Sequence, residues 1–211
     1  MERVGCCRGA PTKSCQREMG RKRFLGIFVN PLYVQNEGLE QVFDNIESVE
    51  ARAICLSLAV ACPAEDGGRF PPLHVDGYER LVARPVWGRR EIRLERFRTF
   101  EPELSIYEAA PYKPLAKPVP PEVDIGIPER MMAEAKRRGM EVHLMFGPFV
   151  PPGVRAEDRP VVVDGAVPQP PRVALNACLN SPAAQAYALA LSEDVARHYP
   201  GVDGLIPDWA E

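Results

Sequence analysis

The stretch "SPAAQAYALALSEDVARHYPGVDGLIPD", residues 181–208, contains a complete helix-to-strand unit. Ser181 is a suitable N-cap and Pro182 suits the first helical position, whereas Pro200 and Gly201 end the helical pattern. Apolar side chains recur at helical spacing along this predicted helix, namely Ala184, Tyr187, Ala188, Leu191 and Val195. Because the short apolar segment "VDGLIPD" follows at once, the stretch predicts a helix packed against a strand.

Earlier segments repeat this alternation. "FLGIFVN" (24–30) is a continuous apolar run, typical of a strand buried on both faces, and "RAICLSLAVAC" (52–62) predicts a second buried strand. "MEVHLMFG" (140–147) predicts the third. Helical periodicity predicts helices over 38–49 and 127–139. Strands alternating with helices indicate an α/β fold with parallel strands and crossover connections.

The connections differ in length on the two sides of the predicted sheet. Each helix-to-strand link is short, but the strand-to-helix links after the second and third strands are long and rich in proline, covering roughly 63–126 and 148–180. Ordinary links of this kind have about 2–6 residues. Barrels and open α/β sheets build their sites at the carboxyl ends of the strands. We therefore expect a binding or catalytic site at that edge.

Two segments resemble a known family. "MMAEAKRRGMEVHLMF" resembles the helix-strand unit that leads into the third strand of α-amylase-like glycoside hydrolase barrels. "NACLNSPAAQAYALALSEDVARHYPGVDGLIPDWAE" is similar to the next unit of glycoside-hydrolase-like barrels, where a C-x-N-x-P turn starts the helix and V-D-G-x-x-x-D supplies the fourth strand. The resemblance covers roughly 24–62 and 121–211. It implies the first four strands of a TIM-type barrel, so that the chain would be the amino-terminal half of a longer one.

The resemblance also implies catalytic residues. Asp208 matches the acid at the end of the fourth strand, which is the nucleophile of α-amylase-type enzymes, although Ile206 replaces the arginine usual two residues before it. Asp203 falls near the start of that strand and is expected to be structural. Glycosidases need two carboxyl groups. Glu211 is the other acid near the end of this strand, so Asp208 and Glu211 are the catalytic candidates.

Further polar and aromatic residues are candidates for substrate binding: Asn30, Tyr33, His143, Asn176 and Trp209. Three of them have a structural alternative. Asn30 could cap the turn at Pro31, His143 could be a hydrogen-bonded core histidine, and Trp209 could be a buried aromatic.

Composition narrows the function classes. The net charge is −3, but residues 1–23 carry seven Arg and Lys against two acids, so the rest of the chain is acidic and argues against nucleic acid as the partner. No run is long enough to span a bilayer. Six cysteines lack zinc-type spacing and indicate a reduced, cytoplasmic protein without a metal site or other cofactor. Residues 1–23 are predicted to be a disordered basic segment and 24–211 a partial barrel domain.

Carbohydrate is the expected partner, with hydrolysis of glycosidic bonds if the full barrel is present. The missing half of the barrel, or another copy of this chain, would complete the fold. Two alternatives stay open: a non-catalytic carbohydrate-binding pseudoenzyme, and an unrelated open-sheet α/β ligand-binding protein. The GxGxxG, P-loop, G-x-S-x-G and H-E-x-x-H signatures are absent from the sequence.

Overall fold

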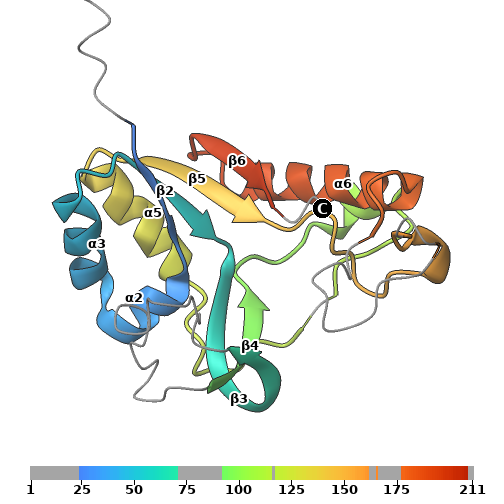
Figure 1. Ribbon diagram of the computed structural model, residues 1–211, viewed down its shortest axis with the longest axis horizontal. Coiled ribbons are helices and arrows are strands. Elements are labelled where there is room, and N and C mark those ends of the chain that lie inside the picture. The colour runs from blue at the N-terminus through green and yellow to red at the C-terminus, as the bar shows by residue number, and fades with distance from the viewer. Residues whose placement is uncertain (1–23, 71–91, 116, 162–164, 166–176, 209–211) are drawn as a thin grey trace, which may run out of the picture.

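The computed structural model describes residues 24–70, 92–115, 117–161, 165 and 177–208. Its centre is a parallel four-stranded sheet (Figure 1). The strands are, in spatial order, β1 (Gly26–Val29), β2 (Ala53–Ser57), β5 (Glu141–Phe146) and β6 (Gly204–Pro207). Spatial order follows chain order, without the reversal at which open α/β sheets bind their ligands. The predicted parallel pairing of four strands is confirmed.

Four α-helices of the described residues accompany the sheet: α2 (Pro31–Glu37), α3 (Leu39–Ser48), α5 (Ile127–Arg137) and α6 (Pro182–His198). The last three match the helices predicted from periodicity. Helix α2 was not predicted. Its start does carry a local signal, since Asn30 is its N-cap: the Oδ1 atom of Asn30 accepts a hydrogen bond from the backbone N–H of Leu32 at 3.0 Å. Gly38 separates α2 from α3 with φ +87°, a conformation that favours glycine.

The hydrophobic core lies between the helices and one face of the sheet. Alternate residues of the two central strands point into it and are completely buried, as are the helical side chains that meet them: Ile54, Leu56, Val142, Leu144, Phe43, Met131 and Val195. All five predicted inward residues of α6 are buried. Val49, the last residue of the helix predicted over 38–49, is exposed and lies just beyond the end of α3.

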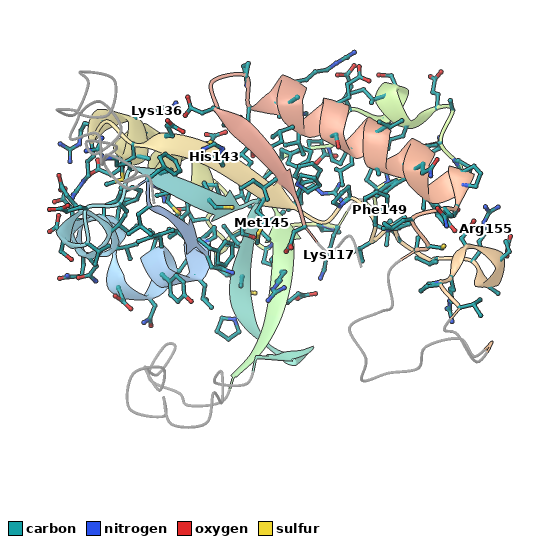
Figure 2. All side chains as sticks on the ribbon, turned by 45° about the horizontal axis from the view of Figure 1, so that its top comes forward. Lys117, Lys136, His143, Met145, Phe149 and Arg155 are labelled. Carbon is teal, nitrogen blue, oxygen red and sulfur yellow. The ribbon has the colours of Figure 1, made fainter. Side chains whose placement is uncertain are left out.

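The opposite face of the sheet is open. Phe28 of β1 is 45% exposed and Ile206 of β6 is 39% exposed. Cys55, His143 and Met145 are partly exposed between them. Figure 2 labels His143 and Met145 on β5. We call these five residues the open face. The prediction that β1 is buried on both faces is therefore wrong, because the described helices cover one side of the sheet. His143 is likewise no core histidine.

A second sheet extends from the carboxyl end of β2. It is an antiparallel pair, β3 (Ala59–Phe70) with β4 (Ile92–Arg98) (Figure 1). The single strand predicted over 52–62 is thus wrong at Leu58, where the chain bends from one sheet into the other. Leu58 and Val60 are both buried, so the apolar run continues through the bend and carries no turn signal.

Two short 3₁₀ helices, η1 (Leu104–Tyr107) and η2 (Ala156–Asp158), lie within the long links. Within the described residues, no helix has the length and apolar character needed to cross a bilayer.

Candidate functional site

The four parallel strands end at one edge of the sheet. The residues that directly follow them are Asn30, Leu58, Gly147 and Asp208. Both long links leave from the same edge, one after β2 and the other after β5. The expectation that Asp208 shares an edge with the elongated links is confirmed, since parallel strands place all their carboxyl ends together.

Asp208 is held by the backbone of the neighbouring strand. Its N–H donates to the carbonyl oxygen of Phe146 at 2.8 Å, which extends the β5–β6 ladder by one bond. Because strand side chains alternate, Asp208 lies on the same side as Ile206 and belongs at the rim of the open face. The pKa of the Cys55 thiol is raised, mainly by burial and also by the negative charge of Asp208. The negative charge of Asp208 therefore influences Cys55, which belongs to the open face.

His143 lies in the row beneath that rim. It is in register with Cys55 on one side and Gly204 on the other. Its Nε2 atom is 3.2 Å from a carboxylate oxygen of Glu141, two residues earlier on the same side of β5. A Cβ atom on Gly204 would lie 2.6 Å from His143 Nδ1, so the imidazole rests against a position that only glycine leaves free.

Asn30 and Tyr33 lie next to the same edge. The Asn30 carboxamide caps α2, as its structural alternative supposed, and a sugar contact remains a prediction. Tyr33, in the first turn of α2, is substantially exposed and could offer its ring to a ligand. Three other predicted residues, Asn176, Trp209 and Glu211, lie outside the described residues.

Asp203 has the structural role expected of it. It lies at the start of β6, at the opposite edge from Asp208. Its carboxylate accepts the backbone N–H of Val142 at 2.7 Å and pairs with Lys136. The Lys136 ammonium is the main reason that the pKa of Asp203 is lowered. Asp203 therefore fixes β6 against β5.

A buried carboxylate that sequence patterns did not reveal organises the link after β5. Asp158 of η2 accepts hydrogen bonds from the hydroxyls of Ser181 and Tyr112, both at 2.5 Å. The Arg155 guanidinium lies 2.6 Å away. These donors, Ser181 first, lower the pKa of Asp158 to about 2. The network connects the link after β5 to the start of α6. The residues that surround Asp158 in the sequence contain no motif that predicts this network.

Asp194 of α6 plays the same part for the link after β2. It is completely buried and accepts the Tyr107 hydroxyl at 2.7 Å. The backbone N–H of Glu103 donates to it at 3.2 Å, which fastens η1 to α6. Burial, followed by the hydrogen bond to Asp194, raises the pKa of Tyr107. Both links are therefore anchored to α6 by buried carboxylates.

A groove of about 280 Å³ lies between the ends of α5 and α6. Its lining includes Met132, Lys136, Val142 and His198. These residues surround the amino ends of β5 and β6, so the groove is separate from the edge that carries Asp208.

Comparison with known proteins assigns no family. No protein-family model, no curated protein and no solved structure matches this chain. Among the described residues, no group of three or more His, Cys, Asp or Glu side chains is placed to hold a metal ion. The function must therefore be argued from the geometry of the sheet edge.

Proposed function

We propose that this chain is a carbohydrate-active (β/α) unit that uses Asp208 at the carboxyl edge of its sheet to act on glycosidic bonds. One observation carries the proposal. Asp208 directly follows β6 on the side of the open face, at the edge from which both long links leave. Such an edge is where barrels of this type collect residues from several strands around a substrate.

The chemistry assigned to Asp208 is that of a nucleophile or general base. Glycoside hydrolysis needs a second carboxyl group, at about 5–5.5 Å for retention or about 6.5–9.5 Å for inversion. Asp208 is the one acid among the four residues that directly follow the strands. The general acid must therefore come from another position.

This single acid favours a second candidate function, non-catalytic carbohydrate binding at the same edge. Tyr33 would then offer its exposed ring for stacking, and Asp208 would accept hydrogen bonds from sugar hydroxyls. Both candidates use the same residues and differ in whether a bond is cleaved.

The test compares three forms of the chain on a panel of aryl glycosides and oligosaccharides. They are the unaltered chain, Asp208→Asn and the control Glu193→Gln, which removes an exposed carboxylate from the outer side of α6. Hydrolysis should fall by about 10²-fold or more in Asp208→Asn, with binding retained, because the amide cannot act as nucleophile or base. Glu193→Gln should behave as the unaltered chain does.

Binding measured by calorimetry separates the candidates. Binding without hydrolysis by the unaltered chain, weakened in Asp208→Asn, supports the second candidate. If the unaltered chain neither binds nor cleaves any member of the panel, or if Asp208→Asn changes neither property, both are wrong.

A further inference from the structure

We propose that the open face is covered by a second copy of this chain, in a two-fold dimer that pairs β6 of each copy with β1 of the other. The two four-stranded sheets would then form one closed ring of eight parallel strands. Neither the dimer nor its test depends on the proposed carbohydrate chemistry.

The first argument is the composition of the open face. Phe28, Cys55 and His143 form one row across the open face. Met145 and Ile206 form the next row, where Ser57 of β2 is in register with Met145. Most of these side chains are apolar, and two of the largest remain about two-fifths exposed. Exposed apolar area of this kind on a central sheet is typical of an interaction surface.

The second argument concerns the edges. β1 and β6 are the outer strands of the described sheet, and each has one side without a strand partner there. Phe24 and Leu25, just before β1, are also exposed. Unpaired edges invite pairing with another chain, and closure into a barrel removes them.

A second copy fits these edges in direction and length. All four strands are parallel, and their spatial order follows chain order. A two-fold axis that runs parallel to the strands therefore brings β6 beside the other copy's β1 in parallel orientation. Both edge strands have four residues. Eight parallel strands is the number at which side chains alone fill a barrel interior.

The area that a stable interface requires also favours the closed ring over a dimer joined through one pair of strand edges. A stable interface buries roughly 800 Å² on each partner. Four residues along one strand edge cannot provide that area. The ring uses both edges and the apolar face between them, where Phe28 and Ile206 would be covered.

The dimer would also complete the site, a consequence that rests on the proposed function. Both copies of Asp208 would lie on the same rim, because the two-fold axis keeps all carboxyl ends at one edge. The second carboxylate that glycoside hydrolysis needs would then come from the other copy.

The test is the mass of the full chain in solution, measured by light scattering and sedimentation across a range of concentrations. Each chain is 23.4 kDa, and the expected mass is twice that value. Ile206→Glu should return the protein to monomer, because it places a charge in the covered interior. Leu189→Glu is the matched control: Leu189 is 73% exposed on α6, and its substitution should leave the dimer intact.

Hydrogen exchange locates the interface. Amides of β1 and β6 should become more protected as the concentration rises, and those on the outer side of α6 should not change. Circular dichroism checks that Ile206→Glu is folded; if it is not, the milder Phe28→Ser takes its place. A chain that stays monomeric, or a dimer whose added protection lies away from β1 and β6, overturns the proposal.

Discussion

At the scale of single residues, buried carboxylates hold the long links in place. Asp158 takes hydrogen bonds from Ser181, Tyr112 and Arg155, which belong to three separate parts of the chain. Hydrogen bonds to the charged form of a carboxyl favour that form, which is why its pKa falls. The residue therefore couples the local fold to pH.

Replacing Asp158 with Asn should lower the melting temperature at neutral pH, because one acceptor of the network becomes a donor. The pKa is about 2 in the folded chain against an ordinary 3.8, so the stabilisation is complete above pH 3.8 and is lost as the pH falls towards about 2. The difference in melting temperature between Asp158→Asn and the unaltered chain should shrink over that window. A difference that stays constant from pH 7 to low pH contradicts this assignment.

Gly204 illustrates how a close approach selects a residue type. Gly204→Ala should destabilise the fold by about 1–3 kcal/mol, because its methyl group would enter the space of the His143 ring. The cost should largely disappear when His143 is replaced by Ala, which a double-mutant cycle of chemical unfolding measures. Gly201→Ala is the control, since a Cβ atom there meets nothing within 4 Å. Equal costs with and without the imidazole would refute the contact.

At the scale of elements, the side chain of Gln35 connects helix α2 to the second sheet. The Gln35 side chain on α2 donates to the carbonyl oxygen of Ala61 at 2.7 Å and accepts its N–H at 3.2 Å. The carboxamide thereby takes the place of a neighbouring strand along β3. We therefore expect Gln35 to help position the β3–β4 pair beside α2.

Gln35→Ala should speed hydrogen exchange at the Ala61 amide and cost about 1 kcal/mol of stability, the usual worth of such a bond. Gln41→Ala serves as control, because Gln41 is exposed and its side chain donates to Asn45 within the same helix, α3. If exchange at Ala61 is the same in both variants, the β3–β4 pair is positioned by other contacts.

At the scale of the whole molecule, the sheet has two chemically different faces. One is filled by helices and contains the core, while the other carries Phe28, Met145 and Ile206 towards solvent. The mass of the chain in solution therefore tests whether the exposed face is covered, since a closed ring would convert this apolar surface into an interior. It also places Asp208 at a rim rather than at an isolated strand end.

The sequence alone determined helices α3, α5 and α6 and the parallel direction of the four strands of the central sheet. Ser181 and the apolar spacing of α6 are local signals, and strand-helix alternation with short return links leaves parallel pairing as the natural arrangement. It also placed Asp208 at the edge with the long links. These features depend on neighbours in the chain, which a sequence displays directly.

Tertiary structure alone decided which sheet face is covered, where β2 gives way to β3, and what surrounds Asp158 and His143. An apolar run looks the same whether one or both of its faces are packed, because burial depends on segments distant in sequence. The bend at Leu58 is hidden for that reason. Asp158 likewise gains its role from Tyr112 and Ser181, which meet it only when the chain folds.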